Sequence, residues 1–331
     1  MSGTIERLAR VKDYRPAQDI VVLALAVGLS LVCALFLPGF ASTDNLVLLL
    51  RSVVVLGVLA TALGLVVISG GLDLSVVSTA VFSSAIVLNV SATHGLALGV
   101  LAGFLCAALV GVVNAFLINA LEIPAFFATL SLGIALYGLT RSLWVPNDTV
   151  YIPENAKALE AFGSERTLGV PSSVIVAALV LIAVQLFLTR TSYGRFMYAH
   201  GDNAGASRLT GIANRRIVLL VYVTSAIIAC IAGLLLTAGT RQLDMPVATS
   251  SLVYNVLLVA VVGGVSLAGG RGSMLGVLAG TLLLGVLVNA MTLLNFDTSQ
   301  QDIVTGVVLL AALVLDNRLH PRNEETARQG E

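Results

Sequence analysis

Long apolar runs restrict the possible folds of this chain more than any other feature. Ten of them come close to the ~20 residues with which a helix crosses a bilayer. Only 11% of the residues are charged and mean hydropathy is +0.98, whereas soluble domains carry roughly 25% charged residues. We therefore expect an all-α integral membrane protein with about ten transmembrane helices. The expected spans are residues 20–40, 45–68, 73–92, 96–119, 124–145, 171–188, 216–238, 250–267, 273–295 and 301–316.

The basic residues orient these spans. An even number of crossings leaves both chain ends on one side, and placing that side in the cytoplasm puts 13 of the 18 Lys and Arg residues inside. The positive-inside rule favours this orientation. The chain then divides into a cytoplasmic tail (1–19), a transmembrane domain (20–317) with a long inner loop (189–216), and a second cytoplasmic tail (318–331).

One pentapeptide occurs twice. The sequence Gly-Val-Leu-Ala-Gly stands at 99–103 in the fourth span and at 276–280 in the ninth. These two spans cross the membrane in opposite directions, as an inverted five-plus-five repeat requires. Chance among four abundant residue types is the alternative explanation.

The residues that most chemistry needs are missing from the spans. Neither Lys12 nor Lys157 completes a phosphate-binding loop, and no expected span contains a histidine. We expect no catalytic residue, no metal site and no cofactor on this chain, and a net charge of zero gives no reason to expect a nucleic-acid partner. Carboxylates lie at span ends rather than at mid-membrane, which argues against an ion-coupled secondary transporter without excluding it.

The inner loop reads TRTSYGRFMYAHGDNAGASRLTGIANRR over 189–216. Asp202 or Asn203 is suited to begin a helix and Gly211 to end it, so AGASRLT forms a helix of barely two turns. So short a helix is marginal alone and needs a surface to pack on. The loop is therefore either a docking helix for another protein or an ordinary basic loop that satisfies the positive-inside rule.

Two glycine turns interrupt the apolar pattern. SGGLDLS (69–75) joins the second and third spans, and LAGGRGS (267–273) joins the eighth and ninth. Gly70 and Gly71 permit backbone geometry that other residues resist, and Asp73 or Ser75 can cap the following helix. Gly269 and Gly270 are expected to permit the same backbone geometry in the second turn.

Four stretches in order resemble one family. RTSYGRFMYAHGDNAGASRLTGI is similar to the coupling loop of permeases from sugar-type ABC importers, the ribose, xylose, arabinose, rhamnose and autoinducer-2 group. SGGLDLSVVS (69–78), PAFFATLSL (124–132) and VVGGVSLAGGRGSMLGVLAG (261–280) resemble further segments of these permeases. The likeness extends over about residues 20–317.

The resemblance implies a multi-pass permease subunit of the bacterial inner membrane, without its own ATPase site. ATP and Mg would bind to partner ATPase subunits, and a periplasmic or lipid-anchored binding protein would deliver a sugar or sugar-like solute. A second copy or a sister permease would complete the pore within the membrane lipid. The resemblance assigns ATPase coupling to Gly194, Arg195, Gly201, Asn203, Ala206, Arg208 and Gly211. It also makes the two glycine turns hinges near the gate, the alternative being tight turns with a helix cap.

The chain departs from the family at several positions. Val77 replaces a glycine, Ser207 an alanine, and Val253 and Asn255 stand where two acids are usual. Pairing with a different, sister permease would accommodate such changes.

Uncharged polar residues within the spans are candidates for the substrate pathway. In lipid, such side chains also hold neighbouring helices together by hydrogen bonds, and both roles are open. The candidates are Asn89, Asn114, Ser131, Asn255 and Asn289.

Overall fold

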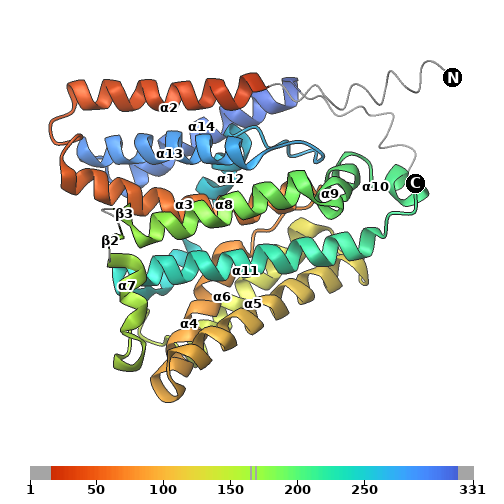
Figure 1. Cartoon of the computed structure of the whole chain (residues 1–331), viewed down its shortest axis with the longest axis horizontal. Helices are drawn as coiled ribbons and strands as arrows, with labels where there is room; N and C mark the ends of the chain where they lie inside the picture. Colours follow the sequence, from red (N-terminus) through yellow and green to blue (C-terminus); the bar gives the residue numbers. More distant parts are fainter. Residues whose placement is uncertain (1–15, 165, 168–169, 320–331) are drawn as a thin grey trace.

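The computed structural model describes residues 16–164, 166–167 and 170–319, and this part of the chain is a bundle of roughly aligned helices (Figure 1). Eight helices are long and apolar enough to cross a membrane, and α12 and α14 add shorter apolar segments. The ten apolar helices are α2 (Pro16–Phe36), α3 (Thr43–Ile68), α4 (Val76–His94), α5 (Leu96–Asn119), α6 (Ala125–Leu143), α8 (Ser172–Arg190), α11 (Asn214–Thr240), α12 (Leu252–Val262), α13 (Met274–Leu293) and α14 (Thr298–Leu319). Each corresponds to one expected span, so the all-α membrane fold is confirmed.

The eighth span differs most from its expected range. Its helix α12 has 11 residues and is about 16 Å long, roughly half the ~30 Å hydrocarbon core of a bilayer. The chain before it forms a strand, β4 (Gln242–Asp244), and a 3-10 turn, η3 (Met245–Thr249). The helix starts close to the expected position but ends five residues early, because Gly263 follows it and Gly264 adopts φ +83°, a conformation that does not continue a helix.

The core lies where α3, α4 and α11 meet. Leu59, Leu63 and Leu65 of α3 are fully buried, and α4 is the most enclosed of the eight long helices. Close approach depends on small residues: a Cβ at Gly111 of α5 would lie 2.5 Å from Cα of Val223 on α11. This is the small-residue packing that substitutes for a hydrophobic driving force in lipid.

The two copies of the pentapeptide pack alike. A Cβ at Gly99 of α5 would lie 2.6 Å from the carbonyl oxygen of Val87 on α4, and one at Gly280 of α13 would lie 2.5 Å from that of Val259 on α12. In each case the helix packs its glycines on the helix that precedes it. Because α4–α5 and α12–α13 turn at opposite ends of the bundle, this arrangement supports the inverted repeat.

The ends of the bundle differ. At one end lie two short helices, α9 (Ser192–Asp202) and α10 (Ala204–Leu209), together with the start of α2 and the end of α14 (Figure 1); we call this the α9–α10 end. The described chain thus begins and finishes at one end, while the tails 1–19 and 318–331 lie largely outside the described residues.

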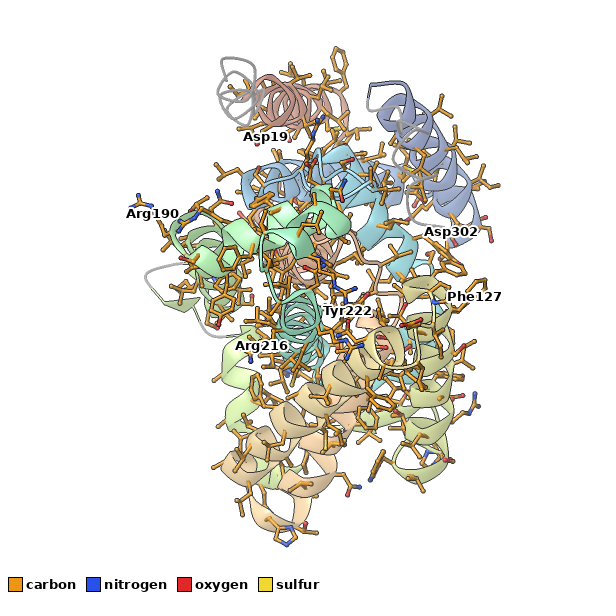
Figure 2. All side chains as sticks on the ribbon, turned by 90° about the vertical axis from the view of Figure 1, so that its right-hand side faces the viewer. Asp19, Phe127, Arg190, Arg216, Tyr222 and Asp302 are labelled. Atoms are coloured by element: carbon orange, nitrogen blue, oxygen red, sulfur yellow. The ribbon has the colours of Figure 1, made fainter. Side chains whose placement is uncertain are left out.

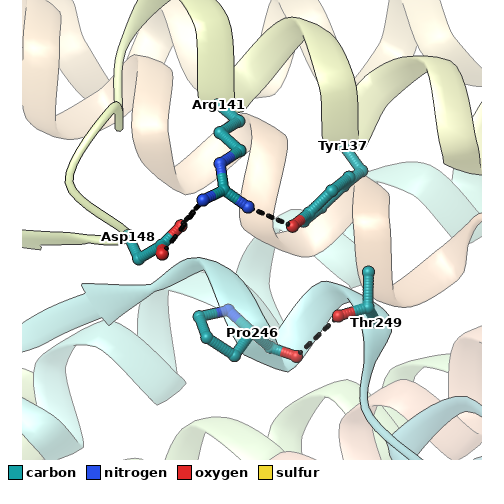
Figure 3. Close-up of polar contacts among 5 residues, drawn as sticks. All are labelled: Tyr137, Arg141, Asp148, Pro246 and Thr249. Carbon is teal, nitrogen blue, oxygen red and sulfur yellow. Dashed lines mark hydrogen bonds and ion pairs between the residues drawn. The ribbon is translucent and has the colours of Figure 1, made fainter.

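The opposite end is covered by short elements between α6 and α8. They are β1 (Thr149–Tyr151), η2 (Glu154–Ala156), α7 (Ala158–Ser164) and the pair β2 (Arg166–Thr167) and β3 (Val170–Pro171). Strand β1 pairs antiparallel with β4. Arg141 of α6 donates to Asp148 at 3.1 Å and to Tyr137 Oη at 2.9 Å, which fixes the loop on the bundle (Figure 3).

Candidate functional site

The loop between α8 and α11 folds into two helices that meet at Asn203. The Asn203 side chain accepts a hydrogen bond from the Ala206 amide at 2.8 Å and caps α10. Gly211 follows the end of α10 with φ +83°, the left-handed conformation expected at that position. The expected short helix is therefore present, whereas α9, with Gly194 donating to Thr191 Oγ1 at 3.0 Å in its first turn, was not expected.

Helix α10 is held firmly by its buried side. Ser207 donates to Asn214 Oδ1 at 2.9 Å, and Asn214 Nδ2 donates to the Ala204 carbonyl at 2.8 Å. Ser207 is the residue that departs from the family alanine, and these bonds give its hydroxyl a structural role. Helix α10 is thereby fixed to the first turn of α11.

The other side of α10 is uncovered. Ala206 and Arg208 are exposed, and Leu209 is 91% exposed, more than any other large apolar side chain in the described part of the chain. Arg195 is also exposed, on α9, and donates to Ser192 Oγ at 3.0 Å. Helix α10 therefore presents an uncovered leucine from a short helix whose other side is fixed.

Glycines from three segments meet at one place: the end of α9, the turn before α4 and the turn before α13. We call Gly70, Gly201, Gly269 and Gly270 the glycine junction. A Cβ at Gly201 would lie 2.6 Å from the Gly270 nitrogen and closer still to the Ile68 carbonyl oxygen, and one at Gly269 would lie 2.9 Å from Gly70 Cα. The Gly270 amide donates to the Ile68 carbonyl at 2.9 Å. The inner loop, through the end of α9, and both glycine turns thus share one backbone contact.

Conformation reinforces the need for glycine in the turns. The φ angles of Gly70, Gly269 and Gly270 are +80°, +85° and +70°, in the region that L side chains rarely adopt. Gly71 is required for space, because a Cβ there would lie 2.8 Å from Tyr222 Oη.

A tyrosine adds a second link between α9 and the junction. Tyr198 donates to the Gly272 carbonyl at 2.8 Å. Burial and the nearby Asp19 carboxylate raise the pKa of Tyr198 to about 12, so the hydroxyl keeps its proton at neutral pH and remains a donor. Asp19 also accepts from Ser273 Oγ at 2.7 Å, which ties the second turn to α2.

Asp73 organises the first turn. Its carboxylate is 2% exposed and accepts from the Ser75 amide at 3.0 Å, from the Ser75 hydroxyl, and from Ser225 Oγ of α11 at 3.1 Å. Asn114 of α5 donates to Ser75 Oγ at 3.0 Å. Of the two caps expected for α4, the Ser75 hydroxyl makes no cap bond although Ser75 stands at the N-cap position, whereas the Asp73 carboxylate accepts from the Ser75 amide at the start of the helix. The acid therefore connects the turn to α5 and α11.

The five candidates for the substrate pathway are not brought together. Asn289 of α13 and Asn45 of α3 exchange two hydrogen bonds of 2.9 Å, and Asn114 is buried at the first turn. Ser131 is exposed on α6 and Asn255 is half-buried on α12. Asn89 is far from the junction, in a cavity of about 110 Å³ with Trp144 and Tyr151 at the opposite end. Asn114 and Asn289 thus make contacts between helices.

Sequence reasoning missed four residues of this site. One is an uncovered apolar side chain, Leu209. The other three donate hydrogen bonds to segments remote in sequence: Tyr198, Tyr222 and Ser225. The two tyrosines were detectable as polar aromatics in a chain with 6% aromatic residues, but their partners lie in remote segments.

Among the described residues no group of three His, Cys, Asp or Glu side chains is arranged to hold a metal ion.

Comparison with known proteins identifies relatives of this chain. A family model described as the permease component of branched-chain amino acid transport systems matches residues 45–313. The ribose import permease of Escherichia coli is 34% identical over 90% of this chain and 92% of its own length. The L-arabinose transport system permease of Escherichia coli is 34% identical over 90% and 89%. The fructose import permease of Rhizobium meliloti is 30% identical over 93% and 88%. No solved structure matches the chain. The chain therefore belongs to the family of ABC importer permeases that includes these sugar permeases.

Proposed function

We propose that this chain is the membrane-spanning subunit of an ATP-driven importer, with ATP and Mg bound by a separate ATPase docked on α10. The observation that carries the proposal is the uncovered Leu209 on a helix fixed by Ser207 and Asn214. An apolar side chain of this exposure suits a groove on a partner protein, where it would form the anchor of the interface.

The glycine junction provides a mechanical route from that interface into the membrane. Helix α9 touches the turn before α4 and the turn before α13 through Gly201. Movement of α9 therefore shifts both turns together. The ATPase would favour one permease conformation by binding it more tightly than the other.

The experiment that tests this proposal is co-purification from native membranes, with bound proteins identified by mass spectrometry. We expect a stoichiometric ATPase with the wild-type chain and its loss from the Leu209→Glu variant. Leu121→Glu is the matched control, since Leu121 is also exposed, at the α5–α6 turn. Retention of the ATPase by Leu209→Glu would remove α10 from the interface. Loss from both variants would point to a general effect of an added acid.

The substrate we propose is a sugar or sugar-like solute, because the relatives named above import ribose, arabinose and fructose. An extracytoplasmic binding protein would deliver it to the end that carries β1 and α7. Uptake of radiolabelled pentoses and hexoses by cells with and without the chain tests the substrate class. Uptake unaffected by deletion of the chain for every sugar tested would contradict it.

A second permease would cover the face formed by α6 and α14. Phe127 and Ile303 are exposed there at 60% and 67%, and Figure 2 places Phe127 and Asp302 on the side of the bundle opposite Arg190. Paired cysteines at these positions would cross-link two permease chains.

An ion-coupled secondary transporter is the alternative, and the buried Asp73 carboxylate is the observation that favours it. Proton coupling predicts uptake that an uncoupler abolishes while ATP is maintained. The importer predicts uptake that persists under those conditions.

A further inference from the structure

An apolar groove runs along the side of the bundle between α3, α8 and α13. Its volume is about 360 Å³, and its walls include Leu50 and Val53 of α3, Ala178 and Ile182 of α8, and Leu278 and Leu282 of α13. The lining contains only two polar side chains, Gln185 and Thr281. Both are engaged with backbone, because Gln185 Oε1 accepts from the Met274 amide at 3.0 Å and Thr281 donates to the Val277 carbonyl at 2.7 Å.

The lining is almost wholly aliphatic, which suits a hydrocarbon chain rather than a polar ligand. An empty groove would forfeit dispersion contacts along its walls.

The groove is slightly longer than one leaflet of the bilayer, and its lining covers the middle of α8. On α8 the lining extends from Val174 to Leu186, a rise of about 18 Å. One leaflet contributes about 15 Å of hydrocarbon. One end of the groove lies at Gln185 and Met274 and faces the α9–α10 end of the bundle.

Basic side chains lie just beyond the end of the groove that faces the α9–α10 end. Arg190 follows Leu186 by four residues and so continues the groove face of α8. Its side chain is exposed and extends away from the bundle in Figure 2. Arg195 and Arg271 are also exposed at this end, and none of the three forms an ion pair within the described part of the chain. Two acids lie in this region: Asp19 accepts a hydrogen bond from Ser273, and Asp202 is exposed at the end of α9 beside Gly270.

We infer that the groove is a binding site for phosphatidylglycerol, with one acyl chain between α3, α8 and α13 and the phosphate held by Arg190. The guanidinium presents paired donors that match phosphate oxygens, and basic pockets between membrane helices recognise anionic headgroups. The lipid would lie beside the end of α8, which continues through Thr191 into α9. The site rests on the groove and its charge, and does not depend on the proposed ATPase.

The test is lipid retention by the full chain. Protein from nanodiscs of equal phosphatidylglycerol and phosphatidylethanolamine is washed in detergent, and both lipids are counted per chain by mass spectrometry. Ala178→Trp fills the groove, and Ala183→Trp is the matched control, because Ala183 is exposed on α8 and does not line the groove. Ile182→Phe fills the groove with a smaller change should Ala178→Trp fail to fold. Arg190→Gln removes the charge.

We expect about one phosphatidylglycerol per wild-type chain and per Ala183→Trp chain, and at least a tenfold loss for Ala178→Trp or Ile182→Phe. Arg190→Gln should reduce the preference for phosphatidylglycerol about fivefold, the equivalent of about 1 kcal/mol per basic residue near an anionic surface. Unchanged retention in the folded groove-filling variants would overturn the site. Equal retention of the two lipids by the wild type would overturn the role of Arg190.

Discussion

Replacing Gly201 with alanine tests the glycine junction through two opposing effects. Gly201 lies in α9, where alanine favours the helix by about 1 kcal/mol over glycine. The added Cβ, however, would lie 2.6 Å from the Gly270 nitrogen and closer to the Ile68 carbonyl oxygen. Neither backbone atom can rotate away, so the turns must separate and the 2.9 Å bond between Gly270 and Ile68 must stretch.

The contact outweighs the helix propensity. Overpacking costs about 1–3 kcal/mol, and weakening a buried hydrogen bond costs about 1–3 kcal/mol. Taking about 2 kcal/mol for each, and subtracting about 1 kcal/mol for the gain in helix propensity, leaves the junction less stable by about 3 kcal/mol. That difference corresponds to an opening equilibrium about 150 times more favourable.

Amide hydrogen exchange measures this opening directly. The Gly270 amide should exchange about 150-fold faster in Gly201→Ala than in the wild type. Gly138→Ala is the control, because a Cβ at that position meets no atom within 4 Å, and its Gly270 amide should exchange at the wild-type rate. Unchanged exchange in Gly201→Ala would refute the close contact. Equal acceleration in both variants would show that the effect is not local.

Three further predictions concern single interactions. Asn203→Ala should remove the cap of α10 and destabilise it by about 1 kcal/mol, seen as faster amide exchange in 204–209 that Asn203→Asp largely restores. A double-mutant cycle with Asn45→Val and Asn289→Val should give a coupling energy of about 1 kcal/mol in thermal unfolding; additive effects would contradict the paired bonds. Burial lowers the pKa of His200, whose Nδ1 has no partner among the described residues. Since the folded chain then binds fewer protons than the unfolded chain, stability should fall as pH drops below the unfolded value of about 6.5, and His200→Gln should flatten that dependence.

The transmembrane part of the fold follows from the sequence, because each apolar run must satisfy its backbone within itself in lipid. The short elements do not follow in the same way. Helix α9 is amphipathic but not apolar overall, so it has no apolar run that separates it from a polar loop. The two-residue strands at 166–167 and 170–171 depend on pairing. The short α12 results from Gly263 and Gly264, which end the helix inside an apolar run that otherwise continues to Leu267.

The sequence predicts only the part of the candidate site that depends on local interactions. The caps at Asn203 and Gly211 are local, and the sequence alone predicts them. The contact of Gly201 with Gly269 and Gly70 joins three segments remote in sequence, so no spacing rule reveals it. The choice between Asp73 and Ser75 as the cap of α4 is open in the sequence; in the fold the Asp73 carboxylate, a stronger acceptor than a hydroxyl, takes both the amide and the hydroxyl of Ser75.

The most direct test of the account places a photo-cross-linking amino acid at position 209 in native membranes, with the same residue at position 121 as the control. The account predicts an adduct with an ATPase subunit at position 209, and none at position 121. An adduct only with lipid at position 209, in membranes where the ATPase is present, would contradict the assignment of α10 as the docking helix.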